Sequence, residues 1–278
     1  MPPSRHPPGG PGGPGGGDGT GESRHPVGSP PASPPPELLL DGPADGPTLV
    51  LAHGAGAPMD SPFLATMAAG LAERGVRVAR FEFSYMRARR EGGGRKAPDR
   101  EPELRRAWLA AIDAIGATGA SGAIAAIGAT GASGPSGATG DSGTSGAGDP
   151  KGGGRRLWIG GKSMGGRIAS MIADQAGVRG LVCLGYPFRP PGADPAVAAR
   201  RTAHLRDLRT PTLIVQGTRD SFGGPDEVAG YALSPRIRVH WIEDGDHSLK
   251  PRKSSGRTEA QNLAEAMDAV AAFVRGGG

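Results

Sequence analysis

The chain has 278 residues, of which 32 are Lys or Arg and 27 are Asp or Glu, and its formal net charge is +5. Basic residues gather between Arg87 and Arg100, but acidic residues interleave with them and no nucleic-acid motif accompanies them, so we expect no nucleic-acid partner. No apolar run is long enough to span a membrane, and the N-terminus lacks an apolar signal core. The single Cys183 excludes an internal disulfide, so we expect a cytoplasmic protein with no membrane partner.

Glycine and proline, with 50 and 28 residues, are concentrated in two segments. Residues 1–36 are mainly Pro, Gly and Ser and cannot bury enough apolar surface to offset chain entropy, so we expect a disordered tail. Residues 116–154 repeat glycine at nearly every third position, and we interpret them as a flexible low-complexity insert. The alternative is a collagen-like oligomerising stalk, which needs far more proline. Apart from this insert, residues 37–275 are expected to form one domain.

Seven apolar runs have the length and continuity of strands, most of them typical of a parallel sheet buried on both faces. They lie at 37–40, 48–52, 76–83, 157–159, 180–184, 212–216 and 237–242. Helical patterns alternate with them at 62–74, 103–115, 167–175, 225–231 and after Thr258. Residues 84–102 are polar and predict a mobile loop, and 189–207 is too short for a large cap. The alternation predicts an α/β fold with a mostly parallel sheet of about six or seven strands, helices on both faces and a minimal cap.

Capping signals mark the ends of two predicted helices. Ser61 followed by Pro62 is typical of an N-cap and a first helical position, and Gly75 is placed to end the same helix. Thr258 with Gln261 three residues later predicts a capping box at the start of the last helix.

The most informative motif is Gly161-Lys162-Ser163-Met164-Gly165, which lies between an apolar strand and a helical segment. This context is typical of a nucleophile elbow, in which a serine occupies a sharp, strained turn. The flanking glycines have no Cβ, so the chain can pass close to itself there. A phosphate-binding P-loop is excluded because Arg156 stands where that motif requires glycine.

Two further reactive side chains follow predicted strands, Asp220 after 212–216 and His247 after 237–242. A serine hydrolase needs a nucleophile, a base that takes its proton and an acid that orients the base. Because the carboxyl ends of parallel strands share one edge of the sheet, we expect Ser163, Asp220 and His247 to meet there as catalytic residues. Asp244 and Asp246 are the rival acids, close to His247 in sequence.

A tetrahedral intermediate also needs N–H donors, and we expect them from the backbone of Met164 and Ala55. Ala55 lies in the small-residue loop 53–57 after the strand 48–52. We expect His53, Gly54 and Tyr186 to contact the substrate. This chemistry requires no metal and no organic cofactor.

Four segments carry a resemblance to a known family: Leu51–Ala57, Gly160–Gly166, Gly217–Asp220 and Asp244–His247. Together they resemble predicted bacterial α/β-hydrolases, which are similar to dienelactone-hydrolase-like enzymes. They are also similar to the hydrolase-like domain of testis-expressed and NSL-complex subunit proteins. The resemblance covers about residues 47–115 and 155–275 and implies an α/β-hydrolase fold. Its nucleophile, acid and base carry over to Ser163, Asp220 and His247. Dienelactone hydrolases have cysteine in place of Ser163, so their substrate is not implied.

These observations predict a serine hydrolase that cleaves a small-molecule ester or thioester through an acyl-enzyme. The alternative is a non-catalytic binding or scaffold protein on the same fold. A third hypothesis, a structural protein trimerised by the glycine-periodic insert, depends on the collagen-like interpretation of 116–154.

Overall fold

The computed structural model describes residues 36–94, 96–120 and 157–276. The tail predicted at 1–36 and the insert predicted at 116–154 therefore lie almost entirely outside the described residues. The remaining predictions concern the sheet and its helices, which the structure describes.

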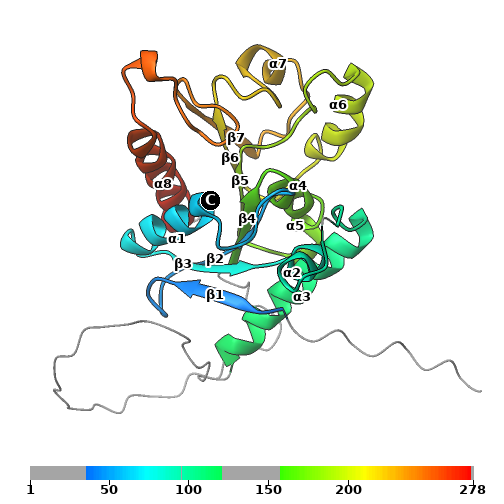
Figure 1. The fold of residues 1–278 in the computed structure, drawn as a ribbon, viewed down its shortest axis with the longest axis vertical. Coiled ribbons are helices and arrows are strands. Elements are labelled where there is room, and N and C mark those ends of the chain that lie inside the picture. Colours follow the sequence, from blue (N-terminus) through cyan, green and yellow to red (C-terminus); the bar gives the residue numbers. More distant parts are fainter. Residues whose placement is uncertain (1–35, 95, 121–156, 277–278) are drawn as a thin grey trace, which may run out of the picture. The chain divides into compact units, whose positions relative to one another are not determined.

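The sheet contains seven strands in the order β1-β3-β2-β4-β5-β6-β7 (Figure 1). The edge strand β1 runs antiparallel to β3, and every other pair of neighbours is parallel. This arrangement confirms the mostly parallel sheet. The strands are β1 (Leu38–Asp41), β2 (Thr48–Ala52), β3 (Arg77–Phe81), β4 (Leu157–Lys162), β5 (Gly180–Leu184), β6 (Thr212–Gly217) and β7 (Ile237–Ile242).

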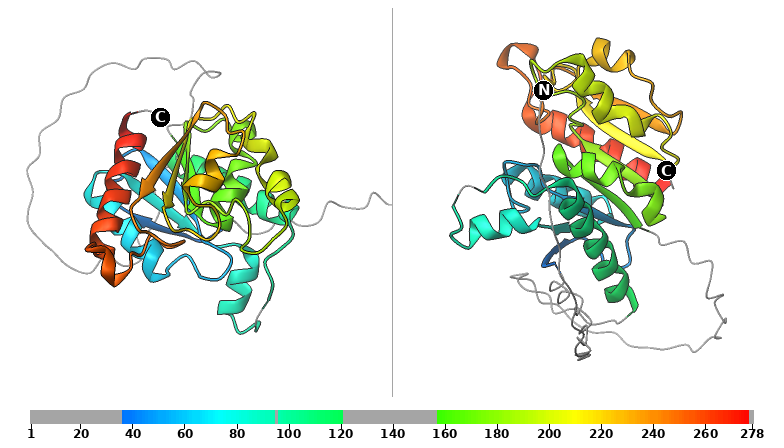
Figure 2. Two further views of the ribbon diagram at one scale, coloured as in Figure 1. Left: turned by 90° about the horizontal axis from the view of Figure 1, so that it is seen from above. Right: turned by 90° about the vertical axis from the view of Figure 1, so that its right-hand side faces the viewer.

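Helices cover both faces of this sheet, as predicted. One apolar core joins the strands to α1 and α8, and the other joins them to α3, α4 and α5. The view from above shows α8, in red, and α4, in green, on opposite sides of the strands (Figure 2). The helices are α1 (Pro62–Glu73), α2 (Ser84–Arg90), α3 (Glu101–Ala120), α4 (Met164–Ser170), α5 (Ala173–Ala176), α6 (Pro195–Thr202), α7 (Pro225–Ala229) and α8 (Glu259–Gly276), with short 3-10 turns η1 (Ala203–Leu205) and η2 (Lys253–Ser255).

Most positions of the central strands are apolar because both faces of these strands are buried. In β2, Leu49 and Leu51 contribute to the core under α1 and α8, whereas Val50 and Ala52 contribute to the core under α3 and α4. Alternate residues of a strand point to opposite faces, so a continuous apolar run fills both cores.

Helix α2 lies where the sequence predicted a mobile loop, so that prediction was wrong. Only Tyr85 and Met86 are buried in it, which leaves no apolar stripe for a pattern to detect. A carboxylate from a later segment stabilises its first turn instead: Asp99 Oδ2 accepts hydrogen bonds from the Ser84 hydroxyl at 2.5 Å and from the Tyr85 N–H at 3.1 Å. A tertiary contact therefore provides the cap that the local sequence lacks.

The segment predicted as one helix at 167–175 is divided into α4 and α5. The Ser170 hydroxyl donates to the Arg167 carbonyl at 2.7 Å. The Met171 N–H donates to the Ile168 carbonyl, three residues before it, at 3.1 Å. This local side-chain bond competes with the next helical hydrogen bond and ends α4.

Other helix ends also differ in detail from the predictions. Helix α3 continues to Ala120, beyond the end expected at Ile115. Ser61 is the N-cap residue of α1, but its side chain makes no capping bond. The capping box of α8 is confirmed, because Gln261 accepts from the Thr258 N–H at 2.8 Å and Thr258 accepts from the Gln261 N–H at 3.2 Å.

The junction between β4 and α4 packs directly against the end of β2. A Cβ added to Gly165 would lie 2.6 Å from the carbonyl oxygen of His53 and 2.7 Å from that of Ala52. A Cβ added to Gly161 would lie 2.8 Å from the carbonyl carbon of Gly165. These obstacles are backbone atoms that cannot rotate away, so both positions require glycine, as the motif predicted.

We expect Gly165→Ala to lower the free energy of unfolding by about 1–3 kcal/mol, because the added methyl forces β2 and α4 apart. Urea denaturation measures this change. The matched control is Gly230→Ala, at an exposed glycine with a φ of −82° whose added Cβ would have its nearest neighbour at 3.4 Å. It should change stability by less than about 0.5 kcal/mol. Equal stability of the two variants would contradict the packing argument.

Candidate active site

Ser163 lies at the turn between β4 and α4 in a backbone conformation that few residues adopt. Its φ and ψ are 51° and −114°. Its N–H donates to the Leu184 carbonyl at 3.0 Å, and its own carbonyl accepts from the Arg167 N–H at 3.0 Å. A non-glycine residue with positive φ stores strain, which the surrounding hydrogen bonds must hold in place. The turn directs the Ser163 side chain to the carboxyl edge of the sheet.

Three side chains from separate strand ends meet at this edge. The Nε2 atom of His247 lies 2.9 Å from Ser163 Oγ, and its Nδ1 atom lies 2.8 Å from Asp220 Oδ2. Since a carboxylate accepts hydrogen bonds, Nδ1 carries the ring proton and donates it to Asp220. Nε2 is then free to accept from the Ser163 hydroxyl. The structure thus brings together the three residues that the sequence predicted as catalytic.

Asp220 is buried and held by several partners. Gln216 Nε2 donates to Asp220 Oδ2 at 2.8 Å, and the Phe222 N–H donates to Oδ1 at 2.8 Å. The Asp220 side chain has no exposed surface, whereas 23% of the His247 side chain is exposed. The Phe222 ring also packs on the imidazole, with ring centroids 4.3 Å apart. These contacts restrict the movement of the Asp220 carboxylate and of the His247 ring.

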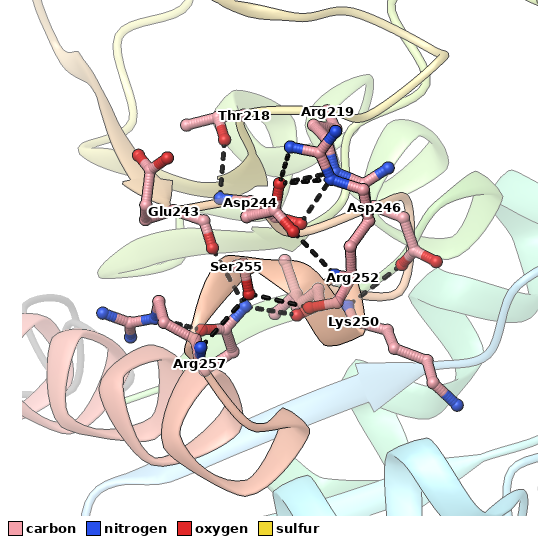
Figure 3. A network of polar contacts seen from close by, with 11 residues as sticks. Thr218, Arg219, Glu243, Asp244, Asp246, Lys250, Arg252, Ser255 and Arg257 are labelled. Carbon is pink, nitrogen blue, oxygen red and sulfur yellow. Dashed lines mark hydrogen bonds and ion pairs between the residues drawn. The ribbon is translucent and has the colours of Figure 1, made fainter.

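The rival acid Asp244 has different partners (Figure 3). Its carboxylate accepts from Arg219 Nε at 3.0 Å and from Arg252 Nε at 2.8 Å, and its N–H donates to the Thr218 hydroxyl at 2.8 Å. Hydrogen bonds from Arg252 hold the pKa of Asp244 below its usual value. Asp246 Oδ1 accepts from the N–H groups of Ser248 and Lys250 within its own loop. Both rivals therefore anchor the His247 loop and neither contacts the imidazole.

The loop 53–57 lies against the serine. A Cβ on Gly54 would be 3.6 Å from Ser163 Cβ. The Tyr85 hydroxyl donates to the Ala55 carbonyl at 3.1 Å and lies 3.3 Å from the Gly54 carbonyl. The His53 Nδ1 donates to the Gly54 carbonyl at 2.7 Å, and its Nε2 accepts from the Phe83 N–H at 3.1 Å. Burial lowers the pKa of His53, consistent with this neutral form.

The predicted substrate contacts divide into two groups. Gly54 adjoins Ser163, but the His53 and Tyr186 side chains have no exposed surface. Gln216 holds Tyr186 through a bond from the Tyr186 N–H at 2.7 Å, and the Tyr186 hydroxyl lies 3.5 Å from Ser170 Oγ. This burial does not support substrate contact by the His53 or Tyr186 side chain, and the His53 ring instead hydrogen-bonds the backbone of Gly54 and Phe83.

Met164 and Ala55 carry the two N–H groups that the sequence predicts as donors. Met164 opens α4, where the first N–H groups have no intrahelical acceptor. Ala55 is exposed in the loop that packs on Ser163. The donor roles of these two N–H groups stay predictions.

Sequence reasoning missed four residues around the site: Tyr85, Lys162, Gln216 and Phe222. Gln216 had a detectable signal, because it is a polar residue at the end of an apolar strand. Lys162 was considered only as part of a P-loop, yet its Nζ donates to the His247 carbonyl at 2.6 Å. Tyr85 and Phe222 lie in polar segments whose folding depends on distant partners, so no local pattern identifies them.

Within residues 36–94, 96–120 and 157–276, no three His, Cys, Asp or Glu side chains form a group that could hold a metal ion. In the same ranges, no helix has the length and apolar character needed to cross a membrane.

Solved structures with this fold come from several bacteria. A lidless α/β serine hydrolase from Xanthomonas campestris is 17% identical, with a TM-score of 0.53 and coverage of 86% of this chain and 87% of the other. A dienelactone hydrolase from Anabaena variabilis is 16% identical, with a TM-score of 0.54 and coverage of 87% and 98%. The esterase domain of a Rhodothermus marinus protein is 16% identical, with a TM-score of 0.52 and coverage of 85% and 90%. At these identities, the likeness shows the shared fold.

The sequence itself matches one protein family over most of its length. The match covers residues 45–131 and 149–275 and therefore includes all of the strands except β1. The residues between the two matched parts lie inside the glycine-periodic segment. Together with the seven-stranded sheet and the fold of the structural neighbours, this match shows that the chain belongs to the alpha/beta hydrolase domain family.

Proposed function

We propose that this chain is a serine hydrolase that cleaves an ester or thioester through an acyl-enzyme. The observation that supports this proposal most directly is the unbroken set of hydrogen bonds from Ser163 through His247 to Asp220, at 2.9 and 2.8 Å. Each of the three side chains comes from a different strand end, so only the folded chain assembles them. The nucleophile, base and acid roles require this geometry.

In the proposed reaction, His247 Nε2 takes the proton of Ser163 while Oγ attacks the substrate carbonyl carbon. The carbonyl oxygen becomes negatively charged, and the N–H groups of Met164 and Ala55 donate to it. His247 then gives its proton to the leaving alcohol or thiol, which departs and leaves an acyl-enzyme. A water molecule attacks the acyl carbon with His247 again as base, and the acid and Ser163 are released. Asp220 orients the ring and stabilises its charged form.

The structural neighbours support hydrolase activity and, of the two proposed substrate classes, the ester. Two of the neighbours are described as an esterase domain and as a lidless serine hydrolase. The segment between β5 and β6 contains only α6 and η1 as regular elements, which is less than a large cap requires. An open site of this kind suits small or extended substrates.

We expect Ser163→Ala to abolish hydrolysis of p-nitrophenyl acetate, since the variant lacks the attacking oxygen. Rates should fall by about 10³-fold or more relative to the unaltered chain. Covalent labelling by a fluorophosphonate probe should disappear at the same time. Ser254→Ala is the matched control, because Ser254 is exposed in η2. If Ser163→Ala retained both labelling and hydrolysis, the nucleophile would be another residue.

Absence of labelling in the unaltered chain would favour the non-catalytic alternative. That result requires an intact fold, which circular dichroism and cooperative thermal unfolding establish. The two hypotheses therefore give opposite outcomes with one probe.

The identity of the acid can be tested by a pair of matched substitutions. Asp220→Asn preserves shape but removes the acceptor that selects the Nδ1–H tautomer, so we expect kcat to fall by about 10³–10⁴-fold. Asp244→Asn weakens the ion pairs with Arg219 and Arg252, so we expect a lower melting temperature and a much smaller loss of kcat. Steady-state kinetics and thermal unfolding of both variants make the comparison. A larger loss of kcat in Asp244→Asn would contradict the role given to Asp220.

A further inference from the structure

Lys162 is the last residue of β4 and immediately precedes Ser163. Its Nζ donates a hydrogen bond to the backbone carbonyl of His247 at 2.6 Å. In the sheet, β4 and β7 are separated by β5 and β6, so this side chain links two loops that the strands alone hold apart. The segments that carry Ser163 and His247 are therefore joined by two hydrogen bonds, one between their own side chains and one from Lys162.

The path of this side chain depends on Gly185, which follows β5. Gly185 has a φ of 66°, and an added Cβ there would lie 2.7 Å from the His247 carbonyl oxygen and 3.0 Å from Lys162 Nζ. The lysine and the carbonyl therefore meet directly over a residue without a side chain. The contact is a close-packed feature of the site and not a chance surface bond.

The ammonium group lies near one aromatic ring and two carboxylates. The Phe63 ring centroid lies 5.7 Å from Nζ, and the carboxylates that influence its charge are Asp220 and Asp246. Neither carboxylate forms an ion pair with it in the part of the chain that the structure describes. Burial lowers the pKa of Lys162 to about 8, against the opposing effect of the two carboxylates. The group is therefore mostly charged at neutral pH.

The His247 loop has other anchors, but they hold different residues. Asp244 is held by Arg219 and Arg252, and Asn262 Nδ2 donates to the carbonyls of Glu243 at 3.2 Å and Leu249 at 2.8 Å. Within the described ranges, the His247 backbone makes one hydrogen bond, in which its carbonyl accepts from Lys162 Nζ. It acts on the residue whose ring must face Ser163.

We propose that Lys162 is a positioning residue, which holds the His247 backbone so that the imidazole remains within hydrogen-bond distance of Ser163. This inference rests on the proposed serine hydrolase function. A displacement of about 1 Å in a reacting group can reduce turnover by about 10²-fold, which gives the scale of the effect. We expect substrate binding to change little, because Lys162 is not among the residues predicted to contact the substrate.

The charge of Lys162 should make kcat depend on pH. A charged donor makes a stronger hydrogen bond than a neutral one. As pH rises through about 8, Lys162 loses its proton, so its hold on the loop weakens and kcat should decline. An arginine at this position stays charged at these pH values.

The test compares the full chain with Lys162→Met, Lys162→Arg and Lys253→Met. Lys253 is an exposed lysine in η2 and serves as the matched control. Hydrogen–deuterium exchange of residues 244–250 measures the mobility of the loop directly. Kinetics with p-nitrophenyl acetate from pH 6 to about 10, after subtraction of the rate without enzyme, measure turnover.

For Lys162→Met, we expect exchange to accelerate about tenfold and kcat to fall about 10²-fold, with KM nearly unchanged. Lys162→Arg should recover part of kcat and lack the decline above pH 8.

Several outcomes would overturn the inference. One is a folded Lys162→Met variant with unchanged loop exchange, and another is faster exchange with unchanged kcat, which would make the lysine a structural tether only. If kcat of Lys162→Arg declined above pH 8 as it does in the unaltered chain, the charge of Lys162 would not be the cause of that decline. If the unaltered chain shows neither hydrolysis nor fluorophosphonate labelling, the proposed function fails instead, and the exchange measurement still decides whether Lys162 holds the loop.

Discussion

The site depends on the reversal of the backbone at Ser163. A positive φ of 51° at a serine is unfavourable in isolation and persists only where its surroundings restrict it. Here β4 lies between β2 and β5, and the closest approaches occur at glycines that have no Cβ to collide. Trp108 Nε1 adds a buried hydrogen bond to the Gly165 carbonyl at 3.2 Å. The strain is thus supported by the same packing that forms the centre of the sheet.

The carboxylates near His247 have separate structural roles because their partners differ. Asp220 is buried beside Gln216 and the imidazole, whereas Asp244 is surrounded by Arg219 and Arg252. Asp220 orients the imidazole of His247, and Asp244 anchors the loop that carries His247. Such preorganisation means that little rearrangement is required when charge develops during a reaction.

Two of the residues that the sequence predicts to contact a substrate are buried inside the protein. These residues are His53, whose ring hydrogen-bonds the backbone of Gly54 and Phe83, and Tyr186, whose hydroxyl lies near Ser170 Oγ. The fold itself hosts many activities, so membership of the family restricts the reaction more than it restricts the substrate.

Much of this protein could be predicted from local patterns in its sequence. Continuous apolar runs indicated the central strands, because most positions of a strand buried on both faces are apolar, and the glycines around Ser163 identified the turn. The order of Ser163, Asp220 and His247 along the chain indicated which side chains would meet. Tertiary structure alone decided the rest: helix α2 exists because Asp99 caps it from a later segment, and Lys162 contacts His247 across two intervening strands. These features depend on contacts between residues far apart in the chain, and a local pattern carries no information about such contacts.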